Sequence, residues 1–150
     1  MTALLLISFS GFLDTATPLP QAHAHNDYEH SRPLQDALAN GFCSVEADIY
    51  LTAQGLLVAH DKKDLRPERT LEALYLKPLR KRVAENQGRV YRDGPKFWLL
   101  IDVKSNASET YRALHDLLEK YADILSTTRG NTHEAKAVTV VISGARDKAF

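Results

Sequence analysis

The stretch SVEADIYLTAQGLLVAHD (residues 44–61) contains the pattern on which the fold prediction depends. It begins with a largely apolar run typical of a strand, passes through a turn at Ala53-Gln54-Gly55 and ends with a second, shorter strand. Side chains alternate between the two faces of a strand, so Glu46 and Asp48 are predicted to share one face. The stretch thus predicts a hairpin that carries two carboxylates and ends in His60-Asp61.

Strand-like and helix-like segments alternate on both sides of this stretch. Apolar runs predict strands over residues 21–25, 44–51, 56–59, 97–103 and 137–142. Helical spacing and end signals predict helices over residues 31–40, 70–87 (interrupted at Pro78) and 106–125. This order favours a parallel α/β sheet. The polar residues that follow the strands fall at their carboxyl ends, where barrel enzymes carry their sites.

The length of the chain limits how much of a barrel it can build. An eight-fold TIM (β/α)8 barrel typically needs ~250 residues, whereas this chain has 150. We therefore expect residues 21–150 to form the N-terminal half of such a barrel, about four strand-helix units with parallel strands, and the chain to be a fragment. The two outermost strands would then be open edges, which promote association.

Residues 1–20 are apolar enough to suggest a signal peptide or its remnant. The run from Ala3 to Phe12 is too short to span a bilayer, so no stable membrane span is expected. This interpretation favours a secreted or periplasmic protein. The alternative is a first helix that packs normally in a cytoplasmic protein.

Composition excludes some partners. The formal net charge is zero, with 19 basic and 19 acidic residues, so nucleic acid is not expected as a partner. The single cysteine, Cys43, excludes an internal disulfide and any cysteine-based zinc site. A small-molecule or lipid substrate remains the expected partner, and the oligomeric state is left open.

Carboxylates at the strand ends form a candidate metal site. Glu46 and Asp48 share a face of one strand, and Asp102 lies near the end of the next apolar run, two residues before Lys104. Oxygen ligands of this kind favour one Mg²⁺ or Ca²⁺ ion over zinc. The lysine would stabilise negative charge on a phosphoryl oxygen. The structural alternative is an ordinary ion pair at the end of a sheet.

Histidines flank this set in the sequence. His60 follows a strand and is a natural general acid for expelling an alkoxide leaving group, although a surface histidine is the common alternative. His23 and His25 lie in HAHNDYEH (residues 23–30), and either could act first. Their His-x-His spacing leaves open a rival metallohydrolase of the amidohydrolase or polymerase-and-histidinol-phosphatase type.

Taken together, these motifs resemble those of the phospholipase C-like phosphodiesterases, a TIM-barrel superfamily that includes glycerophosphodiester phosphodiesterases and phosphatidylinositol-specific phospholipase C. The matching residues run from HAHNDYEH, which resembles a branch with fungal "altered inheritance of mitochondria" proteins, through Glu46-Ala47-Asp48 and His60-Asp61 to Asp102-Val103-Lys104.

The resemblance implies a metal-dependent phosphoric diester hydrolase acting on a glycerophosphodiester or phospholipid-type substrate. It implies His25, His60 and Lys104 as catalytic residues and Glu46, Asp48 and Asp102 as metal ligands. A truncated, non-catalytic relative is the alternative.

Overall fold

The structure is a computed structural model and describes residues 16–145. Most of the expected signal-peptide segment therefore lies outside the described residues. The part that is described already contributes to the sheet, because the first strand, β1, spans Leu19–Ala24. Pro20 fits there because β1 is an edge strand whose pairing is interrupted between Leu19 and His23.

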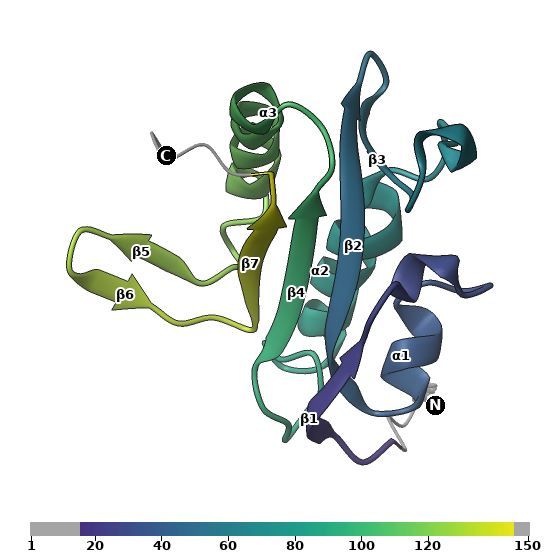
Figure 1. Cartoon of the computed structure of the whole chain (residues 1–150). Helices are drawn as coiled ribbons and strands as arrows, with labels where there is room; N and C mark the ends of the chain where they lie inside the picture. Colours follow the sequence, from purple (N-terminus) through teal and green to yellow (C-terminus); the bar gives the residue numbers. More distant parts are fainter. Residues whose placement is uncertain (1–15, 146–150) are drawn as a thin grey trace, which may run out of the picture.

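Four parallel strands form a curled sheet in the arrangement of a half barrel (Figure 1). Their order is β1, β2 (Phe42–Thr52), β4 (Phe97–Val103) and β7 (Val138–Gly144). The short β3 (Gly55–Val58) pairs antiparallel with the end of β2, as the hairpin signal predicted. β1 and β7 are the outermost strands of the path, so the expected edges are where the sequence placed them.

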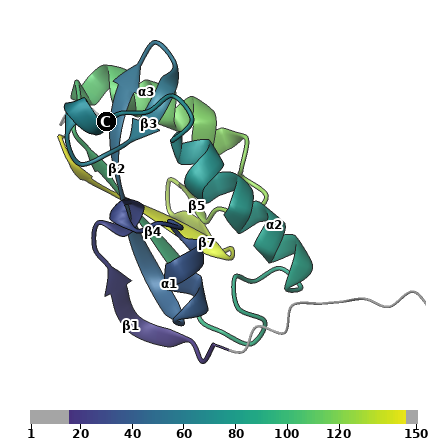
Figure 2. The same ribbon diagram turned by 90° about the vertical axis from the view of Figure 1, so that its right-hand side faces the viewer.

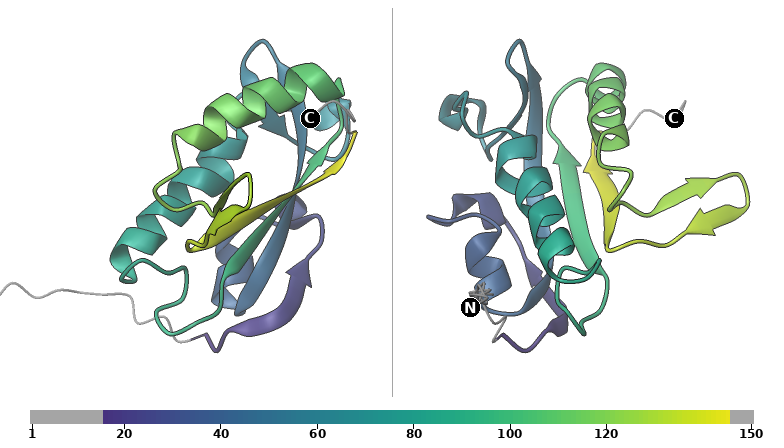
Figure 3. Two further views of the ribbon diagram at one scale, coloured as in Figure 1. Left: turned by 90° about the vertical axis from the view of Figure 1, so that its left-hand side faces the viewer. Right: turned by 180° about the vertical axis from the view of Figure 1, so that it is seen from behind.

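The helices cover one face of this sheet (Figures 2 and 3). They are α1 (Gln35–Ala39), α2 (Lys77–Glu85) and α3 (Ala107–Glu119). Short helical turns are formed by η1 (Asp27–Glu29), η2 (Lys62–Asp64) and the π-helical η3 (Glu72–Leu76). η3 leads directly into α2, and Pro78 explains the break between them, because proline has no N–H to donate to the carbonyl of Leu74.

The two faces of β4 differ in their surroundings. Phe97, Leu99, Ile101 and Val103 are buried, whereas Trp98 on the opposite face is 43% exposed. The parallel register continues this difference across the sheet, since Trp98 pairs with Ser44 of β2 and Thr139 of β7. The apolar core therefore lies between the sheet and the helices, whereas the concave face opposite carries polar side chains beside the exposed Trp98 and Val141.

Three local features differ from the sequence prediction. The helix predicted over residues 106–125 ends at Glu119 as α3. The predicted helix over residues 31–40 is reduced to α1, because Leu34 adopts a left-handed backbone with φ 63° just before it. Residues 127–134, for which the sequence predicted neither a strand nor a helix, form a hairpin of β5 (Thr127–Arg129) and β6 (Thr132–Glu134). The Gly130-Asn131 turn is the signal that could have identified this hairpin.

Among the described residues, none of the helices has both the length and the apolar character needed to cross a membrane.

Candidate metal centre

Three carboxylates converge where the middle of β2 lies beside the carboxyl end of β4. Glu46 and Asp48 lie two apart on β2, and the parallel register pairs Asp48 with Asp102 of β4. Each of the three side chains offers an oxygen, and these oxygens all lie within 4.8 Å of one another. The alternation of side chains along both strands therefore produces the cluster that the sequence predicted.

Lys104 lies against this cluster from the residue after β4. Its Nζ is 2.5 Å from Asp102 Oδ2 and 3.1 Å from Asp48 Oδ2. The hydrogen bond to Asp102 outweighs partial burial and raises the pKa of Lys104. Burial alone would raise the pKa of Asp102, but hydrogen bonds from Lys104 and Ser143 hold it below its usual value. Both groups are therefore charged at neutral pH.

His60 follows β3 and contacts the cluster from the side of β2. Its Nδ1 is 3.3 Å from Asp48 Oδ2 and 3.1 Å from the hydroxyl oxygen of Tyr28. The hydroxyl of Tyr50 donates to the backbone carbonyl of His60 at 2.9 Å. The side chain and the backbone of His60 are thus both held in place. The side chain nevertheless remains 52% exposed.

The two N-terminal histidines have different partners. His25 Nε2 lies 3.3 Å from Glu46 Oε2, while His23 Nδ1 lies 2.8 Å from the Ser44 hydroxyl. Ser44 is two residues before Glu46 on the same face of β2, so His23 contacts the sheet one layer away from the carboxylates. Of the two, His25 is the one in contact with the cluster, and the described His23 and His25 do not converge on a shared site.

The residues after His25 extend the site in a way that the sequence did not reveal. The backbone N–H of Asn26 donates to Glu46 Oε2 at 3.0 Å, and the Tyr28 hydroxyl donates to Asn26 Oδ1 at 2.9 Å. Asp27 between them is fully buried and accepts from the Leu34 N–H at 2.6 Å and from the Tyr75 hydroxyl at 2.9 Å. The loop HAHNDYEH is therefore attached both to the core and to the carboxylates.

Two further contributors come from the end of β7. The Ser143 hydroxyl donates to Asp102 Oδ1 at 2.7 Å. Gly144 follows with φ +77°, and a Cβ atom there would lie 2.5 Å from the same Asp102 oxygen. A larger residue would therefore displace the carboxylate. The position of the Ser143-Gly144 pair at a strand end was the available signal.

The burial of Asp48 tests whether this cluster suits a metal ion. The side chain is 1% exposed and its Oδ2 lies 3.1 Å from the Lys104 ammonium, whereas its Oδ1 accepts no hydrogen bond from the described residues. Buried carboxylate oxygens are normally satisfied by donors or cations. Oxygens of Glu46 and Asp102 lie within 4.8 Å of an Asp48 oxygen, and such a set of three carboxylates fits a hard divalent cation such as Mg²⁺ or Ca²⁺.

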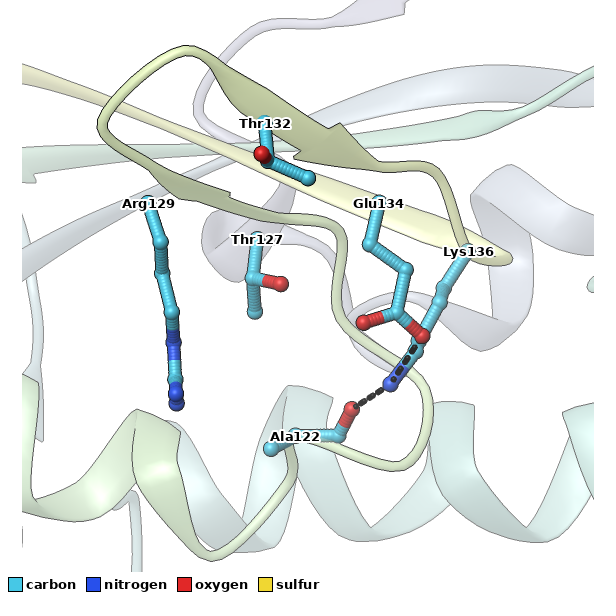
Figure 4. Close-up of a pocket in the computed structure, with 6 residues that line it drawn as sticks. All are labelled: Ala122, Thr127, Arg129, Thr132, Glu134 and Lys136. Atoms are coloured by element: carbon cyan, nitrogen blue, oxygen red, sulfur yellow. Dashed lines mark hydrogen bonds and ion pairs between the residues drawn. The ribbon is translucent and has the colours of Figure 1, made fainter.

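A hollow lies apart from this centre, beneath the β5–β6 hairpin (Figure 4). Its volume is about 250 Å³, and it lies next to the end of α3. The Lys136 ammonium is 3.1 Å from Glu134 and donates to the Ala122 carbonyl at 2.7 Å. Glu134 is the one acidic residue among those that line the hollow, and no histidine lines it. The hollow therefore has no set of converging acidic or imidazole groups.

Comparisons with known proteins give a consistent family description. A family profile described as "AIM6-like phosphodiesterase domain" matches residues 11–149. The chain is 38% identical over 119 residues to "Altered inheritance of mitochondria protein 6" of Eremothecium gossypii, covering 70% of this chain and 31% of that protein. The protein of the same name in Lachancea thermotolerans is 36% identical over 146 residues, 84% of this chain and 34% of the relative.

A homolog of this protein in Arthroderma benhamiae is 30% identical over 149 residues, 85% of this chain and 47% of the relative. The chain thus spans between about a third and a half of the length of these three relatives. No solved structure matches the chain.

Proposed function

Because this chain belongs to the family of AIM6-like phosphodiesterase domains, we propose that it takes part in metal-dependent hydrolysis of a phosphoric diester. The observation that carries the proposal is the carboxylate cluster, in which the buried Asp48, whose Oδ1 accepts no hydrogen bond from the described residues, lies beside Glu46 and Asp102. The two imidazoles that contact this cluster supply groups for proton transfer.

Glu46, Asp48 and Asp102 would hold one Mg²⁺ or Ca²⁺ ion. When bound, such an ion would act as a Lewis acid toward a non-bridging phosphoryl oxygen. Lys104 would add a fixed positive charge beside the same carboxylates, where charge develops on the phosphoryl group in the transition state. The raised pKa of Lys104 keeps that charge in place at neutral pH.

The two histidines would divide the proton transfers. His25, in contact with Glu46, would take a proton from the attacking water or substrate hydroxyl. His60, in contact with Asp48, would give a proton to the leaving oxygen as the P–O bond breaks. Their contacts with different carboxylates support two separate roles, because each imidazole can then face a different oxygen of the diester.

We propose a glycerophosphodiester or a phospholipid-type diester as the substrate class. The support is the resemblance of the sequence motifs to those of phosphodiesterases that act on such compounds. The names of the relatives mention no substrate.

The test is a panel of metals and substrates with the 150-residue chain. Hydrolysis of glycerophosphocholine, lysophosphatidylcholine and bis(p-nitrophenyl) phosphate would be followed in EDTA and after addition of Mg²⁺, Ca²⁺ or Zn²⁺. We expect no turnover in EDTA and recovery with Mg²⁺ or Ca²⁺. Asp48→Asn should reduce turnover by more than the ~10- to 100-fold typical of losing an outer contact.

Asp116→Asn serves as the matched control, because it removes one carboxylate from the exposed surface of α3. It should leave both turnover and metal dependence unchanged. Full activity in EDTA, or one tightly bound zinc per chain by elemental analysis, would contradict the proposed metal chemistry.

A further inference from the structure

We propose that Tyr28 is a positioning residue for His60: its phenol oxygen accepts the Nδ1–H of the imidazole, so that Nε2 is the atom that transfers the proton. The catalytic role given to His60 in this inference rests on the proposed function. The structural content of the inference, which concerns a hydrogen bond and a tautomer, can be measured without turnover.

The direction of the Tyr28 hydrogen bonds follows from the number of protons available. A phenol has one hydrogen, and Tyr28 donates it to Asn26 Oδ1 at 2.9 Å. Its oxygen is also 3.1 Å from His60 Nδ1, and toward that atom it can only accept. A phenol keeps its proton at neutral pH, because its ordinary pKa is about 10.

The other neighbour of Nδ1 requires the same arrangement. Asp48 Oδ2 lies 3.3 Å from Nδ1, and an ionised carboxylate can only accept hydrogen bonds. With acceptors on both sides, the Nδ1 atom of His60 carries a hydrogen in every protonation state of the ring. Within residues 16–145, no hydrogen bond reaches Nε2. That nitrogen is therefore the one available to a substrate.

Tyr28 is itself fixed, and this rigidity makes it a useful anchor. Its side chain is buried, with 2% of the residue exposed, and its backbone carbonyl accepts from the Arg69 guanidinium. Asn26 adopts a left-handed backbone with φ 50°, which directs its N–H to Glu46 and its amide oxygen to Tyr28. Through Asn26, the Tyr28 phenol thus links Glu46, which contacts His25, to the imidazole of His60.

Asp48 alone cannot replace this anchor, because its Oδ2 is also contacted by Lys104 at 3.1 Å. Removing the Tyr28 hydroxyl would leave the His60 imidazole with only the Asp48 carboxylate, among the described residues, as a neighbour of Nδ1, and Lys104 contacts the same carboxylate oxygen. The ring could then rotate and present Nδ1 instead of Nε2. We expect loss of orientation rather than loss of the proton-transfer group, and hence a fall in kcat with little change in KM.

The experiment uses the full chain labelled with ¹⁵N-histidine, and the His60 signals are assigned by their absence from His60→Gln. In the wild type, at a pH where the ring is neutral, we expect the Nδ1–H tautomer. Tyr28→Phe should give a mixture of tautomers and lower kcat by ~10-fold, the lower end of the range for outer contacts. Tyr121→Phe removes a hydroxyl that bonds Glu72 near α2 and should change neither quantity.

A second variant keeps the test decisive if Tyr28→Phe folds poorly. Asn26→Gly retains the left-handed backbone but removes the amide oxygen that takes the phenol proton. The phenol can then donate to Nδ1, so this variant should also shift His60 away from the Nδ1–H tautomer.

Three outcomes separate the hypotheses. An Nε2–H tautomer in the wild type would overturn the inference, as would a Tyr28→Phe protein with unchanged tautomer and kcat. The expected tautomer shift in a chain that hydrolyses no diester under any metal condition would support the positioning of His60 while overturning the proposed function.

Discussion

The two faces of β4 show how one strand can carry both stability and chemistry. On the face toward the helices, Leu99 and Ile101 are completely buried. On the opposite face, Trp98 is 43% exposed and Asp102 joins the carboxylate cluster. Because neighbouring residues point to opposite faces, a change of one position along the strand moves a substitution from one environment to the other.

This comparison separates two kinds of mutational effect. Substitutions on the covered face should reduce the free energy of unfolding, because they remove packed apolar volume. Substitutions around the open face should reduce turnover and leave folding nearly unchanged, because their side chains contact the site and solvent. Each of the following variants tests whether effects on stability and effects on turnover are separate.

The largest expected effect belongs to His60→Ala on the site side. Loss of a general acid should lower turnover by ~10² to 10⁴. The loss should be smaller for p-nitrophenyl esters, whose leaving group needs little protonation. Steady-state kinetics on both leaving-group types measures the difference. An equal loss with both types would indicate a structural role. A matching fall in the free energy of unfolding would show that turnover and stability do not respond separately.

On the covered face, Ile101→Ala should reduce the free energy of unfolding by about 2–5 kcal/mol, because it leaves a cavity beneath the helices. Trp98→Ser, three positions earlier on the exposed face, is the matched control and should cost much less. Urea denaturation followed by circular dichroism measures both. Equal losses would show that the open face is packed against something in solution, for instance a second copy.

The smallest effect concerns Asp27, a buried carboxylate within the otherwise apolar layer. Burial raises its pKa above the ordinary value of 3.8, although hydrogen bonds from Leu34 and Tyr75 oppose the shift. The folded chain therefore binds this proton more tightly than the unfolded chain. Stability from this group is fully present below pH 3.8 and falls as pH rises through the folded pKa.

Asp27→Asn keeps the acceptor for both donors and should change the free energy of unfolding by ~1 kcal/mol or less at neutral pH. The variant should lack the decline with rising pH, so its stability relative to the wild type should improve from acid to neutral conditions. Urea titrations at several pH values measure this difference. The opposite slope would mean that Asp27 is stabilised as a carboxylate.

The sequence predicted the elements whose patterns are local. Apolar runs identified β2, β4 and β7, and the helical end signals placed the start of α3 at Asn106, whose side chain accepts from the Glu109 N–H. The shortened α1 could not be predicted, because the backbone of Leu34 is held by a hydrogen bond to Asp27, seven residues earlier, within a buried turn. The β5–β6 hairpin was missed because strands of three exposed residues show no hydrophobic period.

The site was predictable to the extent that alternation along strands determines it. Glu46, Asp48 and Asp102 follow from a period of two and from the alignment of parallel strand ends. The contacts of Tyr28 and Ser143 could not be predicted in this way, because each depends on a different segment returning to the same place.

The order of the strands in the sheet has a consequence for synthesis on the ribosome. β1, β2, β4 and β7 lie side by side in the order in which they are translated. After β1 and β2 have paired, each later strand can join a free edge as it emerges, with no need to insert between strands already in place. The helix-covered face of the sheet can then form stepwise, because the helix that connects two parallel strands is synthesised before the second of those strands.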